Sequence, residues 1–147
     1  MILAIAGMIA LLFYPFTQGI KKVKLSDLET QISSQLKKQK LQKKSADDLR
    51  LHLHISNEEY DDFLYYGTSS FMDVNEVIIV YSPSHVTDIL SKMNTHLEQQ
   101  NKAFDGYGES QMELLKKAKI FNLDDYAIYI VSDTQELYES ILAYVRK

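Results

Sequence analysis

The sequence predicts an α+β domain with a mostly antiparallel sheet of about four strands, helices packed on one side of that sheet, and an N-terminal transmembrane helix before it. Three observations predict this arrangement. The first residues form a long uncharged run, whereas the rest of the chain mixes charged and apolar positions. Two pairs of apolar runs indicate hairpins, and a long helical pattern lies between the pairs. Two hairpins separated by a helix do not give the strand-helix-strand repetition of a parallel sheet.

The N-terminal segment is long enough to cross a membrane. No residue from Ile2 to Ile20 carries a charge, and about 20 apolar residues span roughly 30 Å of hydrocarbon. Tyr14 and Phe16 lie toward one end, where interfacial rings are favoured, and lysines follow from Lys21 onward. The alternative is a cleaved signal peptide, but no small-x-small cleavage site follows the apolar core. We therefore expect a retained anchor over residues 1–20.

Charge divides the chain sharply. Residues 21–44 carry eight lysines and two acidic residues, a net charge of +6, and residues 45–147 carry eight basic and eighteen acidic residues, a net charge of −10. We interpret 21–44 as a basic juxtamembrane helix and linker that contacts anionic membrane lipid, and 45–147 as a globular α+β domain. The acidic body lacks the clustered basic face that nucleic acid requires, so nucleic acid is not an expected partner.

The first elements follow from capping patterns and periodicity. Ser26 and Glu29 form a capping-box pattern that predicts a helix over 27–38. Ser45 begins a second pattern, which predicts one or two helical turns up to about Leu53. The lysine-rich residues between the two helices read as a solvated linker.

The remaining elements form the predicted sheet and its helices. A strand is expected over 62–66, and another over 74–81 whose unbroken apolar run is typical of a strand buried on both faces. The sequence Ser82-Pro83-Ser84 then begins a long helix to about Phe104. The C-terminal part predicts a short helix over 111–117, strands over 118–122 and 126–131 joined at Asp124-Asp125, and a final helix from Thr134.

The histidines do not predict a metal site. His52 and His54 share one side of an extended chain, and paired imidazoles can bind a transition metal. A metal needs further ligands, and His85 and His96 lie far along the chain with no linking motif. We interpret all four histidines as surface or boundary residues, and we expect neither a metal nor a cofactor.

The sequence contains none of the familiar catalytic motifs. There is no Gly-x-Ser-x-Gly elbow, phosphate-binding glycine loop or His-Glu-x-x-His motif, and no cysteine for thiol chemistry. Adjacent carboxylates such as Asp124 and Asp125 are typical of solvated turns rather than of tuned acid-base pairs. We assign no catalytic residue, and a binding protein is favoured over an enzyme.

Three residues are candidates for ligand binding. Gln100 continues the apolar helix face of Met93 and is expected to be at least partly buried. Glu76 is in phase with Ile78 on the central strand, and if it faces inward it needs a hydrogen-bond donor. Structural anchoring is the first interpretation of both. Tyr107 lies between two glycines, and it either covers the edge of the core or is exposed for binding.

Three stretches of sequence resemble a bacterial family known as domain of unknown function 4358. They are VNEVIIVYS, HLEQQNKAFDGYGESQMELL and AKIFNLDDYAIYIVSD, and the resemblance extends from about residue 62 to the C-terminus. The family usually has a glycine in the last hairpin, where this chain has two aspartates. The residues that carry the resemblance are Glu76, Gln100, Phe104, Tyr107 and Ser132-Asp133.

What the resemblance implies is a cellular setting rather than an activity, because no activity, substrate or cofactor is established for that family. Similar proteins come mainly from Gram-positive bacteria and carry a lipoprotein or anchor signal that places the domain outside the cytoplasmic membrane. The positive-inside rule, applied to the lysines after Ile20, predicts the opposite side. We favour a single-pass protein with an extracytoplasmic domain, on the reasoning that a longer basic N-terminus precedes Met1.

Three functional hypotheses follow. The leading one is a membrane-anchored envelope protein that acts as a binding or interaction module, whose acidic body recognises a protein, peptide or cell-wall ligand. The first alternative is a hydrolase-like enzyme of an unrecognised type that uses Glu76, Gln100 or Tyr107 in a cleft. The second alternative is a structural subunit of a membrane complex, which a large exposed apolar patch would favour.

Overall fold

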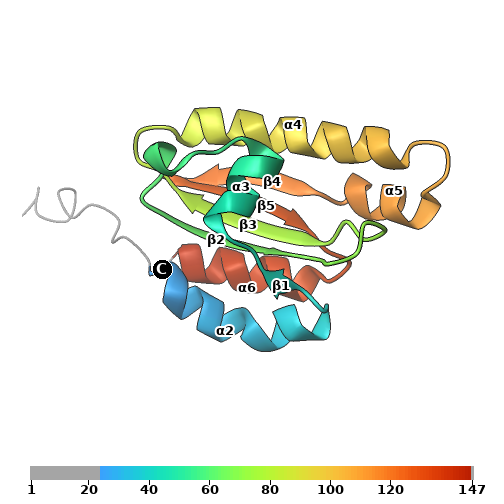
Figure 1. The fold of residues 1–147 in the computed structure, drawn as a ribbon. Helices are drawn as coiled ribbons and strands as arrows, with labels where there is room; N and C mark the ends of the chain where they lie inside the picture. The colour runs from blue at the N-terminus through green and yellow to red at the C-terminus, as the bar shows by residue number, and fades with distance from the viewer. Residues whose placement is uncertain (1–23, 147) are drawn as a thin grey trace, which may run out of the picture.

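The computed structural model describes residues 24–146, in which one antiparallel sheet lies between two groups of helices (Figure 1). The sheet has the strand order β1-β2-β3-β5-β4, and every neighbouring pair is antiparallel. The α+β class and both predicted hairpins are confirmed, and a fifth strand is added. The elements in chain order are α2 (Leu25–Lys38), β1 (Gln42–Lys43), α3 (Ala46–Leu53), the 3-10 helix η1 (Asn57–Glu59), β2 (Asp62–Gly67), β3 (Glu76–Tyr81), α4 (Val86–Phe104), α5 (Glu109–Lys116), β4 (Lys119–Leu123), β5 (Tyr126–Val131) and α6 (Gln135–Val145).

The transmembrane helix predicted over residues 1–20 lies outside the described residues. Within residues 24–146, no helix is both long and apolar enough to cross a membrane.

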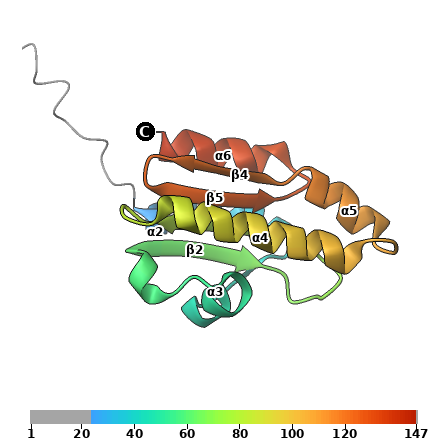
Figure 2. The same cartoon turned by 90° about the horizontal axis from the view of Figure 1, so that it is seen from above.

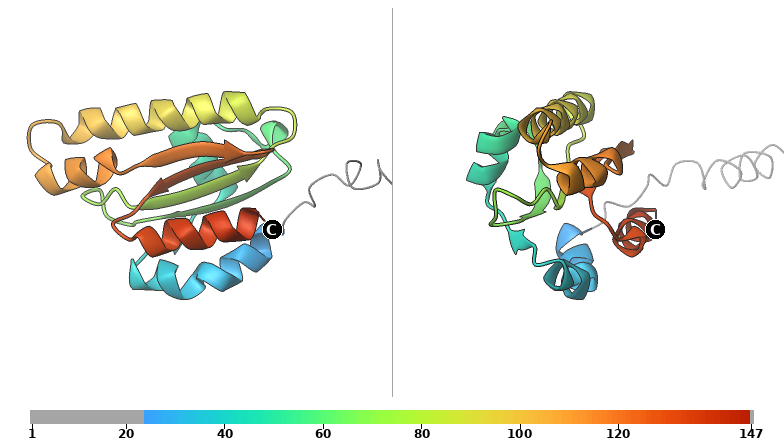
Figure 3. Two further views of the ribbon diagram at one scale, coloured as in Figure 1. Left: turned by 180° about the vertical axis from the view of Figure 1, so that it is seen from behind. Right: turned by 90° about the vertical axis from the view of Figure 1, so that its right-hand side faces the viewer.

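Helices cover both faces of the sheet, so the prediction that they pack on one side is wrong. Helix α4 lies along one face, together with α3 and α5, while α2 and α6 lie on the opposite face (Figures 2 and 3). The reason lies in the central strands. Every residue of β5 is buried, and so is every residue of β3 except its last. A strand that is apolar on both faces needs a layer of helices on each.

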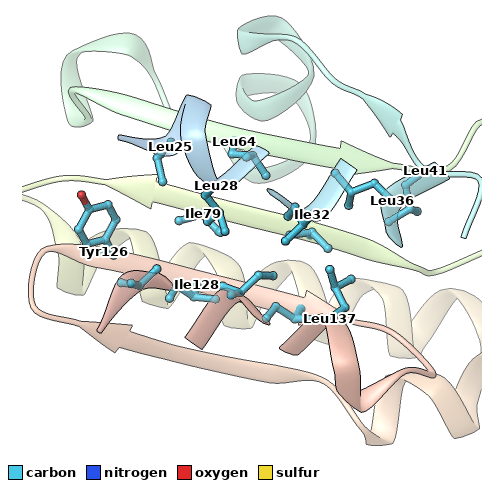
Figure 4. Close-up of a cluster of buried hydrophobic side chains, with 14 residues drawn as sticks. Leu25, Leu28, Ile32, Leu36, Leu41, Leu64, Ile79, Tyr126, Ile128 and Leu137 are labelled. Atoms are coloured by element: carbon cyan, nitrogen blue, oxygen red, sulfur yellow. The ribbon is translucent and has the colours of Figure 1, made fainter. Parts of the chain in front are cut away.

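The first core lies between the sheet and the pair α2 and α6 (Figure 4). Helix α2 contributes one apolar stripe, whose four side chains are each 2% exposed or less: Leu25, Leu28, Ile32 and Leu36. They pack with Ile79 of β3 and Ile128 of β5. The structure therefore places in this core a helix that the sequence assigned to a juxtamembrane segment. Within the stretch predicted to be a linker, Gln42 and Lys43 form β1, which pairs with the end of β2.

The second core lies on the other face, beneath α3, α4 and α5. Ile78 and Val80 of β3 point into it, opposite Ile89 and Met93 of α4. Tyr65 of β2 and Tyr129 of β5 also face this side. Both are opposite Ile78 in the register of the three strands, so the two phenols flank β3 beneath α4.

The start of α2 differs from the capping box predicted for it. The residue before the helix is Lys24, and no side chain caps it, so Ser26 lies inside the first turn. Glu29 instead accepts hydrogen bonds from Tyr66 Oη at 2.5 Å and from Lys43 Nζ at 2.9 Å. Burial opposes ionisation of Glu29, but these two bonds and the positive charge of Lys43 together outweigh it and lower the pKa of Glu29. Glu29 thus ties α2 to β2 and β1.

Helix α3 begins as predicted, after Ser45, and the contribution of this cap to stability can be measured. Ser45 Oγ accepts a hydrogen bond from the Asp48 N–H, and Asp48 Oδ2 accepts one from the Ser45 N–H. Replacing Ser45 by alanine should lower the free energy of unfolding by about 1 kcal/mol in urea at neutral pH. The matched control is Ser26→Ala, which removes no cap and should change stability by less than about 0.5 kcal/mol. Equal effects of the two substitutions would contradict this account of α3.

The same cap has a defined pH dependence. The hydrogen bond from the Ser45 backbone lowers the pKa of Asp48 below its ordinary value. A carboxyl group whose pKa is lowered in the folded state stabilises the fold above its unfolded pKa, and this contribution is lost as the pH falls through the folded pKa. The stability difference between the wild type and Asp48→Asn should therefore shrink as the pH falls through the acidic range.

Candidate functional site

A group of polar side chains lies at the end of the sheet where β2 ends and β3 begins. Glu76 is the first residue of β3, and its side chain faces α4 because it is in phase with Ile78. His96 and Gln100 lie one turn apart on α4 and reach down to it. We call Glu76, His96, Gln100, Tyr65 and His52 the Glu76 cluster.

Glu76 is held by three side-chain donors. Its Oε1 accepts hydrogen bonds from His96 Nε2 at 2.8 Å and from Gln100 Nε2 at 3.4 Å, and its Oε2 accepts one from Tyr65 Oη at 2.8 Å. The residue is 7% exposed, as is His96. A carboxylate can accept about four hydrogen bonds, so little of its capacity is left for a ligand. The three donors compensate for the burial of the carboxylate.

The cluster continues to the surface through Tyr65 and His52. The Nδ1 atom of His52 lies 3.2 Å from Tyr65 Oη. Because that hydroxyl donates to Glu76, it accepts from His52, and we assign the proton of His52 to Nδ1 and that of His96 to Nε2. Burial and the neighbouring Glu76 raise the pKa of Tyr65, which keeps the phenol protonated. A chain of hydrogen bonds thus joins an exposed histidine to a buried one.

Tyr129 borders the cluster without a hydrogen bond. Its ring centre is 5.5 Å from that of His96. Its hydroxyl is buried and finds no hydrogen-bond partner among residues 24–146. Burial, and after it the charge of Glu76, raise the pKa of this phenol too. Glu76 therefore lies between two neutral phenols.

The cluster forms one wall of a cavity of about 280 Å³. The other walls come from the loop between β2 and β3 and from the residue that follows β1. Phe71 lies at this cavity and is 97% exposed. The lining residues outside the cluster are Lys44, Gly67, Thr68, Ser69, Ser70, Phe71 and Asp73.

The loop that carries Phe71 is fixed by hydrogen bonds. Thr68 Oγ1 bonds to the carbonyl oxygens of Ser70 at 3.2 Å and Asp73 at 3.3 Å. The side chain of Gln111 on α5 donates to the Met72 carbonyl at 2.7 Å. These hydrogen bonds fix the backbone on both sides of Phe71, and in this conformation Phe71 is exposed.

The structure brings together two of the three residues named as ligand-binding candidates. Glu76 and Gln100 are in contact, and the expectation that both need partners is met. Tyr107 lies elsewhere, in the loop between α4 and α5, where it is 68% exposed, packs against Phe104 and lines a separate cavity.

The sequence does not predict three members of the cluster, namely Tyr65, His52 and His96, and of these His96 carries a local signal. It was interpreted as a surface or boundary residue, and this is wrong because it is buried. The signal was present, since His96 follows Met93 by three residues and precedes Gln100 by four, which places all three on one helix face. In the part of the chain that the structure describes, no group of three potential ligands could hold a metal ion.

The fold and the site define the class of protein: an α+β domain with helices on both faces of its sheet and a polar cavity at one end of it. The family model described as Domain of unknown function (DUF4358) matches residues 34–132, and the chain belongs to this family. The matched region contains the whole Glu76 cluster and the loop of Phe71, and it confirms the resemblance. No curated protein and no solved structure matches the chain.

Proposed function

We propose that the protein is a membrane-anchored ligand-binding module of the bacterial envelope, and that the cavity beside the Glu76 cluster is its binding site. The observation that supports this best is a buried carboxylate, held by three side-chain donors, at the wall of a cavity. Buried polar networks fix side-chain positions, and positioned polar groups in a concave site are what small-ligand recognition needs.

Stability alone is a weak reason for such a cluster. Replacing a buried Glu–His pair by well-packed apolar side chains is often neutral or stabilising, because taking both groups out of water is costly. Ionisable groups that are buried at the wall of a cavity are more typical of functional sites. The position of Glu76 and His96 at the cavity therefore supports a role in recognition.

The arrangement of the fold suits attachment through the N-terminal side. Helix α2 begins at the end of the domain opposite to the loop between β2 and β3 (Figures 1 and 3). In this proposal residues 1–20 lie in the membrane and the lysines that follow contact anionic lipid. The cavity then faces away from the bilayer, where a soluble or wall-attached ligand can reach it.

A binding screen tests the proposal. The full chain, purified in mild detergent, is heated with amino acids, dipeptides, monosaccharides, nucleotides and polyamines in turn. We expect one class to raise Tm by about 5 °C at about ten times its Kd. Ser69→Trp, which adds a bulky side chain to a residue that lines the cavity, should remove this shift. Ser91→Trp, on the exposed side of α4, is the control that should retain it.

Two results of this screen would contradict the proposal. One is that none of the compound classes raises Tm. The other is an equal rise in Tm for Ser69→Trp and Ser91→Trp, since binding would then occur away from the cavity.

The proposed side of the membrane has its own test. Protease added to intact cells should digest the domain if it faces outward. Digestion that requires lysis of the cells would overturn the extracytoplasmic placement and would leave the binding cavity itself unaffected.

A second candidate function is a hydrolase-like enzyme, and one contact favours it. Glu76 fixes the imidazole of His96 at the cavity wall through Nε2, which leaves Nδ1 as a base. The test is mass spectrometry of the compound that binds, after incubation with the protein. Recovery of the compound unchanged supports a binding module, whereas a product that His96→Gln no longer forms supports the enzyme.

A further inference from the structure

The cavity combines an exposed aromatic ring with polar groups that carry both hydrogen-bond donors and acceptors. Phe71 is 97% exposed at the cavity, and it is the one fully apolar side chain of the lining. Ser69, the ring of His52 and the amide of Gln100 line the same space. Ser69 and the amide of Gln100 can each donate and accept, whereas His52, whose Nδ1–H donates to Tyr65, accepts through Nε2.

The charges at the cavity disfavour a strongly charged ligand. Glu76 already receives three hydrogen bonds, and Asp73 Oδ1 accepts from the backbone and side-chain N–H groups of Asn75. An added cation would therefore compete with these existing hydrogen-bond donors for the carboxylate oxygens. An added anion would meet Lys44, but it would also lie close to both carboxylates, which repel it. A neutral ligand avoids both costs.

The size of the cavity limits the ligand to about one ring. Sites for drug-sized molecules measure roughly 300–1,000 Å³, and this cavity, at about 280 Å³, lies just below that range. A single sugar ring has suitable chemistry, because it presents a face of C–H groups on one side and hydroxyl groups around its edge. The C–H face matches an exposed phenyl ring, and the hydroxyl groups match a lining that offers both hydrogen-bond donors and acceptors.

We propose that the cavity binds a neutral sugar ring, with the ring face against Phe71 and the hydroxyl groups toward His52, Ser69 and Gln100. This inference rests on the proposed binding function and names the ligand class of that site. The alternative occupants are a peptide residue and a charged metabolite, and the experiment separates them.

The test is saturation-transfer NMR and calorimetry of the full chain with glucose, galactose, N-acetylglucosamine and short oligomers of N-acetylglucosamine. Glucosamine and glucuronic acid serve as the cationic and anionic counterparts. We expect at least one neutral sugar to bind, and to bind more tightly than its charged counterpart. Phe71→Ala should weaken binding by about tenfold, and Phe71→Trp should preserve it.

Tyr107→Ala is the matched control, because it removes an exposed aromatic ring from a different loop and should leave Kd unchanged. Phe71 is almost wholly exposed, so its replacement leaves the core intact. The inference is overturned if no neutral sugar binds, if the charged counterparts bind more tightly, or if Phe71→Ala has no effect. If a dipeptide or nucleotide binds instead, and Ser69→Trp removes that binding, the sugar is overturned as the ligand class but the proposed binding function is supported.

Discussion

A chain that begins at Ser45 should not fold, whereas one that begins at Lys24 should unfold in a single cooperative transition. The shorter chain lacks β1 and five core side chains of the α2 side: Leu25, Leu28, Ile32, Leu36 and Leu41. Burial of one such side chain contributes about 2 kcal/mol, so their joint loss of roughly 10 kcal/mol equals the whole stability of a typical domain. Urea unfolding followed by circular dichroism measures this directly.

A point substitution tests the same claim without a deletion. Leu28 is fully buried, and Leu28→Ala should lower the free energy of unfolding by about 2–5 kcal/mol. Leu51→Ala is the matched control, because Leu51 is 60% exposed on α3 and its change should stay within about 0.5 kcal/mol. A cooperative transition in the chain from Ser45, or a negligible effect of Leu28→Ala, would show that α2 is dispensable.

The second large effect is expected at Glu76. Glu76→Ala leaves the buried donors of Tyr65 and His96, and the partly buried donor of Gln100, without their shared acceptor. Removing one partner of a buried, hydrogen-bonded charged group costs about 3–5 kcal/mol, so a loss of about 3 kcal/mol in urea is expected. Glu139→Ala, at an exposed position of α6, is the control for loss of an acidic side chain.

A double-mutant cycle shows whether the loss comes from the pair. Glu76→Ala and His96→Ala should together cost at least about 1 kcal/mol less than the sum of their separate effects, because each single change leaves the other group unsatisfied. Strict additivity would mean that the two side chains act independently. The apolar variant Glu76→Leu with His96→Leu should recover most of the stability and still bind no ligand.

The sequence predicted the secondary structure because its signals were local. The apolar runs of β3 and β5, the stripe of α2 and the cap at Ser45 all depend on residues close together in the chain. The two residues of β1 have no periodic signal, and their strand exists because they meet the end of β2. Pairing with a distant partner is a property of the fold, so the local sequence of β1 predicts a linker.

The layer arrangement was mispredicted for a different reason. The unbroken run in β3 already indicated burial on both faces, but the lysines near α2 suggested a helix beside the membrane. Lys37 and Lys38 lie in the last turn of α2, where positive charge stabilises the helix by interaction with its dipole. The helix dipole alone accounts for lysines at this position, so they do not require a membrane beside α2. The apolar stripe of α2 instead covers the sheet.

The site was half predictable. Glu76 and Gln100 were identified because each interrupts an apolar series with a polar group, a local signal. Tyr65 and His52 could not be identified in this way, because their contact with Glu76 depends on the register of β2 against β3 and on the position of α3. His96 has the helical phase of a buried residue, but its contact with Glu76 depends on how α4 lies across the sheet.

The most direct test of the account is NMR mapping of the backbone amides as the full chain is titrated with each compound class of the binding screen. We expect one class to shift the amides of residues 68–73, Glu76 and 96–100 together, and we expect Ser69→Trp to abolish these shifts. Shifts confined to other surfaces, such as β4 or α6, or no shifts in the Glu76 cluster with any class, would contradict the claim that this cluster forms a ligand-binding site.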